Sequence, residues 1–552
     1  MTGAPPPFTM PVVLVEDDTR LAAPIATPSR DAYPARRAPR SLTFRLPPGL
    51  LAVGTVAVLI VVLPVLVALA QAFQGGPAAA FDAIKATSAT TLLLHTGLVT
   101  ALAVPASAVL GVSTAWFIER TRLPWRGLWT LLIVAPLTMP LFVTSYAWSA
   151  LSPSLNGYLG AAGIISFSYY PIVFLLVAAA LRNMDPALEE SARSLGLNAR
   201  QTFFRVVLPQ LRPAVLGGLL LVLLDTLVEF DAFVALKYQT FSVNVYAQYQ
   251  LSFSASGAAA LSLLSIVVCV FVLFGESRLR GDASYARVSQ GARRAIVRQP
   301  LGRATPLVLG ALTLIVAVGL GIPFGELIHW FTEGSGVAAG ASLHQLGSAA
   351  VTSVAIGVAS ALVAVVLATP VAVLAVRYRG RVVTVLERAT YLSFALPDLV
   401  AAIALAYAAS HYVQSLYGSF ALLVLADAML FVPFAVVALR TTLGQIEPAL
   451  DDSARALGAG PVSAFWRVTV PLARPALAAA GVLVFAFVLG DLSTAQVLLP
   501  PNATTLGTEF EANASTVAFA AAAPFAAMLV GLALLATYLL MNRFGRVRAL
   551  GS

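Results

Sequence analysis

The sequence is poor in the residues on which most soluble enzymes depend. Its 552 residues include one cysteine, Cys269, so these residues can form neither an internal disulfide nor a metal site built from several cysteines. Only 11% of the residues are charged, whereas 59% are hydrophobic. This balance is far too apolar for a soluble globular domain and indicates a protein with several membrane spans.

Lysine is almost absent as well. Lys85 and Lys237 are the only two, and neither follows a glycine-rich loop, so the P-loop that binds nucleotide phosphates is missing. The four histidines are scattered, and no spacing typical of a zinc site, a serine hydrolase or a redox cysteine pair occurs. We therefore expect no catalytic residue, no metal site and no cofactor in this chain.

Twelve apolar stretches are long enough to span a membrane. A hydrocarbon core of about 30 Å requires about 20 helical residues. Several stretches contain proline, which neighbouring helices can accommodate inside a membrane. The sequence thus predicts an all-α membrane protein with twelve transmembrane helices. The predicted spans are 50–73, 92–118, 127–151, 158–182, 213–236, 258–276, 305–331, 349–376, 389–410, 417–440, 473–499 and 518–541.

Two polar segments between these spans are copies of one another, 262 residues apart. Each begins with an acid, has a glycine six residues later and ends with a proline thirteen residues after the glycine. The two sets are Glu190, Gly196 and Pro209, and Asp452, Gly458 and Pro471. Six spans fall in each half, and an even number gives both halves the same orientation. The pattern predicts two parallel repeats related by an axis along the membrane normal.

The duplication divides the chain into four parts. Residues 1–48 are rich in proline and arginine and are predicted to be a disordered cytoplasmic tail. Residues 49–276 form the first six-helix repeat, 277–304 a basic cytoplasmic linker, and 305–545 the second repeat.

The basic residues predict the orientation. With the N-terminus inside, 32 of the 34 lysines and arginines fall in cytoplasmic segments, and only Lys85 and Lys237 lie outside. Both termini and both polar copies are then cytoplasmic. The net charge of +9 follows from this topology and favours anionic lipid, so we expect a bilayer and not nucleic acid as the partner.

The two polar copies resemble the EAA loop of the permease subunits of binding-protein-dependent ABC importers. The family pattern is E-A-A, three residues, G, nine residues, I-x-L-P. The first copy departs from it at Ser191 and Val206, and the second at Asp452, Ser453, Val468 and Val470. The resemblance implies a type I importer permease whose two loops dock on a cytoplasmic ABC ATPase dimer. The docking residues it implies are Glu190, Ala192, Gly196 and Pro209, and Asp452, Ala454, Gly458 and Pro471.

Acidic residues inside predicted spans are a second signal. They are Asp225, Glu229 and Asp231 near the end of the fifth span, Asp491 in the eleventh, and Asp398 and Asp427 elsewhere in the second half. Glu229 and Asp491 are matched at 262 residues, and Asp225 shares a helix face with Glu229. Charges at this depth are costly and face a cavity or a partner. Two interpretations remain open: Asp225, Glu229 and Asp491 line a path for a cation, or the acids pack against donors at helix ends.

A fused permease of twelve spans with two EAA loops resembles the ferric-iron permease subfamily. Residues 224–231, 240–246 and 489–495 are similar to its fifth span, its outer loop and their second-half counterpart. The resemblance implies a bacterial inner-membrane importer of ferric iron that receives its substrate from an extracytoplasmic solute-binding protein. Thiamine, an aminoalkylphosphonate or another small polar solute are alternative substrates. A secondary transporter is a further alternative, but it would have inverted repeats.

Overall fold

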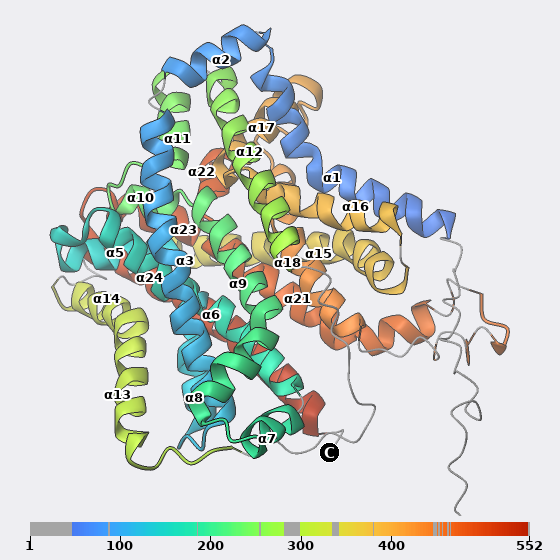
Figure 1. Ribbon diagram of the computed structural model, residues 1–552. Helices are drawn as coiled ribbons and strands as arrows, with labels where there is room; N and C mark the ends of the chain where they lie inside the picture. The colour runs from blue at the N-terminus through green and yellow to red at the C-terminus, as the bar shows by residue number, and fades with distance from the viewer. Residues whose placement is uncertain are drawn as a thin grey trace, which may run out of the picture. The chain divides into compact units, whose positions relative to one another are not determined.

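The computed structural model describes residues 47–549, except for 75, 87–88, 185, 253–254, 281–297, 334–341, 379, 445–449, 451–452, 455, 461–462 and 464. Nearly all of the predicted tail 1–48 and most of the predicted linker 277–304 therefore lie outside the described residues. Within the described part, all regular structure is helical apart from one isolated bridge between Thr121 and Gln299 (Figure 1).

Nine helical segments in the described part of the chain are long and apolar enough to cross a membrane. They are α1 (Pro48–Ala72), α3 (Ala89–Arg120), α6 (Tyr158–Asn183), Arg200–Val228 ending with α9 (Leu208–Val228), Gly302–Thr332 from α13 (Thr305–Val316) to α14 (Ile322–Glu333), α15 (Leu343–Arg377), α18 (Phe420–Leu443), Phe465–Gly490 ending with α21 (Val470–Gly490), and α24 (Phe519–Ala549). The predicted sixth span falls in α12 (Ala255–Arg280), whose apolar part is the shorter segment Ala259–Val272.

The predicted third and ninth spans are not continuous helices. Arg126–Leu137 meets Leu141–Leu151 at 89°, and Arg381–Ser393 meets Asp398–Tyr412 at 97°. Pro140 and Pro397 stand at these two breaks, each directly before the second helix. Proline disfavours the helical conformation of the residue before it and has no N–H to donate, so each apolar stretch bends at its proline. Counting each bent pair as one span gives up to eleven.

The predicted fifth and eleventh spans end earlier than expected, at Val228 and Gly490. A short helix follows each break, α10 (Asp231–Ala235) in the first half and α22 (Ser493–Leu498) in the second. A π-helical turn precedes each long helix, η4 (Phe203–Val207) before α9 and η8 (Phe465–Thr469) before α21. These breaks and turns recur at the same 262-residue interval as the sequence repeat.

The remaining short elements connect the long helices. They are α2 (Gly76–Ala86), α4 (Arg126–Val134), η2 (Ala135–Thr138), α5 (Leu141–Leu151), η3 (Pro153–Leu155), α7 (Pro186–Ser194), α8 (Ala199–Thr202), α11 (Phe241–Ser252), η5 (Gly302–Ala304), η6 (Ala317–Gly321), α16 (Arg381–Thr390), η7 (Tyr391–Ala395), α17 (Asp398–Tyr412) and α23 (Leu506–Ala514).

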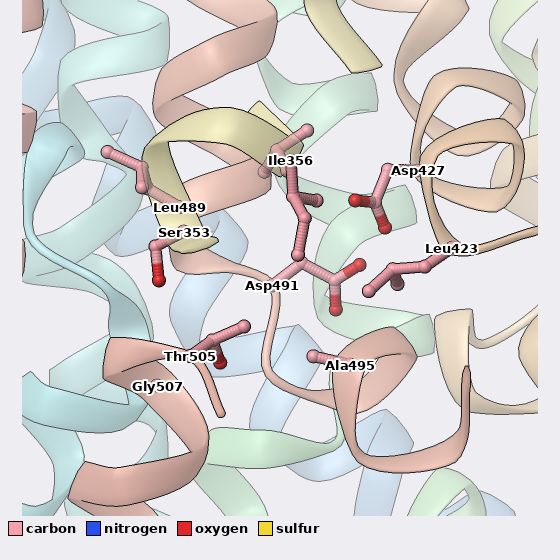
Figure 2. A pocket seen from close by; sticks show the side chains of 10 residues that line it. Ser353, Ile356, Leu423, Asp427, Leu489, Asp491, Ala495, Thr505 and Gly507 are labelled. Atoms are coloured by element: carbon pink, nitrogen blue, oxygen red, sulfur yellow. The ribbon is translucent and has the colours of Figure 1, made fainter. Parts of the chain in front are cut away.

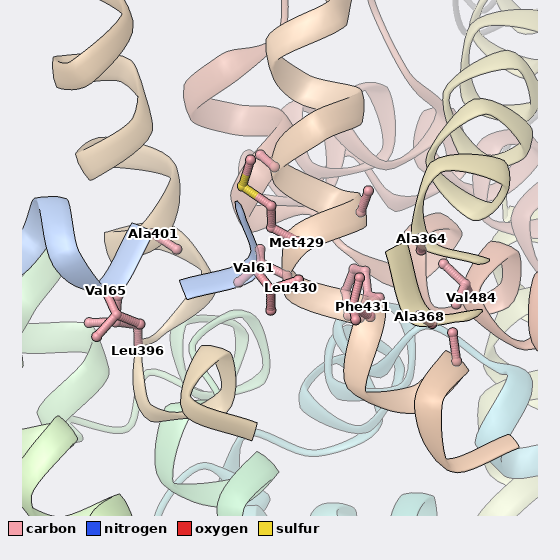
Figure 3. Close-up of a cluster of buried hydrophobic side chains, with 14 of the residues drawn as sticks. Val61, Val65, Ala364, Ala368, Leu396, Ala401, Met429, Leu430, Phe431 and Val484 are labelled. Carbon is pink, nitrogen blue, oxygen red and sulfur yellow. The ribbon is translucent and has the colours of Figure 1, made fainter. Parts of the chain in front are cut away.

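The first long helix of each repeat packs on the other repeat. Figure 3 shows Val61 and Val65 of α1 in one buried cluster with Leu396 and Ala401 of the second repeat. At Gly54 an added Cβ would lie 2.5 Å from Leu374 of α15, so this glycine permits the close approach. In return, α13 packs on α4 and α14 packs on α5 of the first repeat. The two repeats are therefore interlocked.

Candidate functional site

In the first of the two segments predicted to dock on an ATPase (190–209 and 452–471, here called the docking loops), the helix α7 is closed by a left-handed glycine. Gly196 follows α7 with φ +85°, and the N–H of Leu197 donates to the carbonyl of Ala192 at 3.2 Å. This is the helix-ending turn that glycine favours, because a Cβ is strained at positive φ. A Cβ on Gly196 would meet nothing within 4 Å, so the backbone conformation and not the space requires glycine.

The second docking loop has the same ending. Gly458 has φ +87°, and the N–H of Ala459 donates to the carbonyl of Ala454 at 3.1 Å. Asp452 lies outside the described residues, so its docking role stays a prediction. Pro209 and Pro471 lie inside the helical segments Arg200–Val228 and Phe465–Gly490, just after a π-helical turn, and each lacks the N–H that would donate to that preceding turn.

The motif acid Glu190 and its neighbour Glu189 have different surroundings on α7. Glu190 is exposed, as a docking residue should be. Glu189, which sequence reasoning did not select, is buried and forms an ion pair with Arg120 at 2.9 Å. The Glu189 side chain is 9% exposed and the Arg120 side chain 3%. Arg120 is the last residue of α3, so this pair joins the docking helix to a long helix of the first repeat.

The residue before Arg120 extends this network. Glu119 is buried and forms ion pairs with Arg126 at the start of α4 and with Arg182 near the end of α6. Gln299 follows the part of the predicted linker that the structure does not describe. Its N–H donates to the carbonyl of Arg120, and its carbonyl accepts from the N–H of Arg122. The helices α3, α4, α6 and α7 and the segment at Gln299 therefore meet at the end of α3.

Large apolar side chains stand exposed on both docking loops. Leu195 and Leu457, directly before the two glycines, are 84% and 89% exposed. Phe204 and Trp466, in the two π-helical turns, are 55% and 63% exposed. Each pair is separated by 262 residues, and repeated exposure of bulky apolar groups beside charged ones is typical of a protein-binding surface.

Glu229 and Asp491 lie at the two helix breaks, where each caps the short helix that follows. The N–H of Ala232 donates to Oε1 of Glu229 at 2.9 Å, and the N–H of Thr494 donates to Oδ1 of Asp491 at 3.1 Å. The two bonds are repeat-equivalent. They satisfy N–H groups that have no partner within the short helices, so both acids have a structural role.

The second oxygens of these acids have different surroundings. Oε2 of Glu229 accepts a hydrogen bond from Tyr169 at 3.2 Å. Oδ2 of Asp491 is buried and receives no hydrogen bond within the described part of the chain. Asp491 lines a cavity of about 20 Å³ together with Asp427, whose carboxylate accepts from Ser360 at 3.3 Å (Figure 2). That volume holds about one water molecule.

Carboxylates from both repeats come together around these breaks. Asp231 accepts a hydrogen bond from Ser493 of the second repeat at 2.7 Å, and Asp398 begins α17, on which Phe230 of the first break packs. Asp225 also lines a second small cavity, against Phe434 of the second repeat. The sequence therefore selected residues that converge, although Asp225, Glu229 and Asp491 are only part of the set.

Glu511 of α23 is an acid near this set that sequence reasoning missed. It accepts a hydrogen bond from Tyr146 at 3.0 Å and acts on Asp231. Its sequence signal is weak, because it lies in a polar stretch between two spans and has no acidic counterpart in the first half. Among the described residues, no three or more His, Cys, Asp or Glu side chains are arranged to hold a metal ion. The acids thus form a spread array and not a chelating site.

Residues 107–279 and 364–547 each match the family of binding-protein-dependent transport system inner membrane components. The two matches contain both docking loops and both capping acids. The chain belongs to this family: it is a multi-pass inner-membrane permease subunit of an ABC importer, a transport component and not an enzyme.

Among its relatives, the Fe(3+)-transport system permease protein FbpB 2 of Haemophilus influenzae is 32% identical over 469 residues, which cover 85% of this chain and 93% of the relative. The ferric transport system permease protein FbpB of Actinobacillus pleuropneumoniae is 26% identical over 376 residues, covering 64% of this chain and 53% of the relative. The sulfate transport system permease protein CysT of Escherichia coli is 29% identical over 196 residues, or 32% of this chain and 70% of the relative.

Proposed function

We propose that this permease imports ferric iron and that the converging carboxylates line its path. The observation that carries the proposal is the meeting of the two acid-bearing helix breaks, where Ser493 of one repeat donates to Asp231 of the other and Glu229 and Asp491 cap the two short helices. Fe(III) is a hard cation that prefers oxygen ligands, and fixed carboxylates offset part of the cost of moving it into a low-dielectric channel. The relative that aligns over 93% of its own length is named for Fe(3+) transport.

The absence of a chelating cluster among the described residues supports transport over storage. A path must bind its ion strongly enough to admit it and weakly enough to release it. Acids spread over α9, α10, α17, α18 and the second break offer several weak contacts in succession. A sulfate path, suggested by the sulfate relative that aligns with 32% of this chain, would expose its anion to these repelling charges.

The docking loops and the distribution of arginine support the partners and the orientation. With both termini in the cytoplasm, the exposed Leu195 and Leu457 and the left-handed glycines face a cytoplasmic ABC ATPase dimer, one loop for each subunit. The acid array then lies towards the outer side, where an extracytoplasmic solute-binding protein delivers iron. The matched apolar residues beside Gly196 and Gly458 support this assignment.

Uptake in reconstituted liposomes tests the function. The permease, its ATPase and the solute-binding protein encoded beside it are assembled, and ATP-dependent entry of radioactive Fe(III), thiamine and sulfate is compared. We expect iron to enter at the highest rate. Entry of thiamine or sulfate without entry of iron would overturn the substrate assignment while leaving the family assignment intact.

The double variant Glu229→Gln with Asp491→Asn tests the path. Each amide keeps an oxygen that can cap the short helix, so the fold is preserved while two negative charges are removed. We expect a severe loss of iron uptake, a partial loss in each single variant, and unchanged basal ATP hydrolysis because the docking loops are untouched. Iron uptake at the wild-type rate in the double variant would show that the acids are only structural.

A further inference from the structure

One hydrogen bond joins two repeat-equivalent side chains. The hydroxyl of Ser493 donates to Oδ1 of Asp231 at 2.7 Å, and the two residues are 262 positions apart. In a structure made of two repeats related by rotation, a position can touch its own copy only where both lie close to the rotation axis. Asp231 and Ser493 therefore mark the axis between the repeats, and a path shared by both repeats must pass there.

The elements that carry this bond are firmly held. Asp231 is the first residue of α10 and Ser493 the first of α22, and the caps from Glu229 and Asp491 fix both helices to their breaks. The residue before each one is buried in a cluster that includes side chains of the opposite repeat. Phe230 packs on Leu399 and Ile403 of α17, whereas Leu492 packs in a cluster with Phe142 of α5. The bond thus joins the start of α10, which packs on the second repeat, to the start of α22, which packs on the first.

We propose that Asp231 and Ser493 close the transport path at the axis, and that their hydrogen bond must break for substrate to pass. This inference rests on the proposed function, because it assumes that the path follows the converging acids. The unequal pair suits a closure that opens for a cation. Two aspartates would repel each other on the axis, whereas one aspartate and one serine attract, and separation frees a carboxylate to face the cation.

A reversible disulfide tests the closure. Asp231→Cys and Ser493→Cys are combined with Cys269→Ala, which removes the only native cysteine, and a protease site is inserted within 281–297. After oxidation and cleavage, we expect the two halves to stay linked on a non-reducing gel and iron uptake to fall to background. A reductant should return uptake to the level of the same variant before oxidation, which is the reference because it already lacks the Asp231 carboxylate. The control pairs Asp231→Cys with Thr494→Cys, because successive residues of a helix point about 100° apart, so a cysteine one residue further along α22 should not link.

A charge placed on the axis provides a second measurement that does not depend on iron. Ser493→Asp sets two carboxylates against each other, and we expect passive entry of Mn²⁺ into calcein-loaded liposomes without ATP. Ser493→Asn can still donate to Asp231 and should remain as tight as the wild type. A disulfide that forms without blocking uptake, or an aspartate variant as tight as the asparagine variant, would overturn the closure. A wild-type protein that carries no iron, while the cysteine pair links on the gel and Ser493→Asp leaks Mn²⁺, would overturn only the substrate.

Discussion

Replacing Glu189 by glutamine should destabilise the protein far more than the same change at Glu190. The Glu189 carboxylate pairs with Arg120 at 2.9 Å, and both side chains are nearly inaccessible to solvent. Removing one partner of a buried ion pair leaves the other charge uncompensated and costs about 3–5 kcal/mol. Glu119 also acts on Arg120, but its ion pairs are with Arg126 and Arg182, so it compensates Arg120 only in part.

That loss is large beside a typical stability of about 5–15 kcal/mol for a folded domain. At Glu190, which is exposed, we expect a change within about 0.5 kcal/mol, as for most surface substitutions. The buried thiol of Cys269 is a natural reporter of unfolding, because a thiol-reactive dye labels it only when the helices separate. The assay is thermal unfolding of the detergent-solubilised permease followed by dye fluorescence.

The neutral pair Arg120→Gln with Glu189→Gln separates charge from packing. If the cost in Glu189→Gln comes from an unpaired guanidinium, neutralising Arg120 as well should recover part of the lost stability, and the double-mutant cycle measures the coupling. Equal unfolding temperatures for Glu189→Gln and Glu190→Gln would refute the reasoning. If Glu190→Gln loses ATPase co-purification while its stability is unchanged, this would support a docking role for Glu190 and an anchoring role for Glu189.

Two further predictions concern the docking loops. Gly196→Asp and Gly458→Asp force a side chain into a left-handed conformation at a cost of about 1–2 kcal/mol, and each should insert normally but lose uptake and ATPase co-purification; normal binding and uptake in both variants would argue against docking. Cysteines placed at Arg200 and Gly460, in a chain whose native cysteine has been replaced, should resist an impermeant reagent in intact cells and react after permeabilisation. The reason is that the 32-to-2 division of basic residues predicts both loops inside. Labelling in intact cells would show that the predicted orientation is wrong.

The docking loops could be predicted in some detail because their signal is local. A polar segment between long apolar ones is conspicuous, its duplication at 262 residues makes coincidence improbable, and a glycine after a short helix is typical of a left-handed helix end. Gly196 and Gly458 have this conformation, with φ of +85° and +87°. The docking role itself stays a prediction.

What the sequence could not show depends on tertiary contacts. Glu189 and Glu190 are adjacent and chemically alike, and only the phase of α7 against α3 decides which of them is buried. The bends at Pro140 and Pro397 were not predicted because both arms of each bent pair are apolar, so the combined apolar stretch is long enough for one span. Those prolines were a usable signal, since proline disfavours helix at the preceding residue. The convergence of Asp398 and Glu511 with the matched acids depends on how the repeats interlock.

The two interpretations of the acids at the helix breaks describe different oxygens of the same side chains. Glu229 and Asp491 each use one oxygen to cap a short helix, which is the role of an acid packed against helix-end donors. The other oxygen of Asp491 is buried beside the cavity that Asp427 also lines. An alanine at either position would remove the cap and the charge together, so its failure to transport would show nothing about the path. The amide variants keep one acceptor for the cap, while the second oxygen becomes an uncharged NH2 group. A loss of uptake in these variants with an unchanged unfolding temperature therefore assigns the charge to the path, whereas a parallel fall in both assigns the residues to the fold.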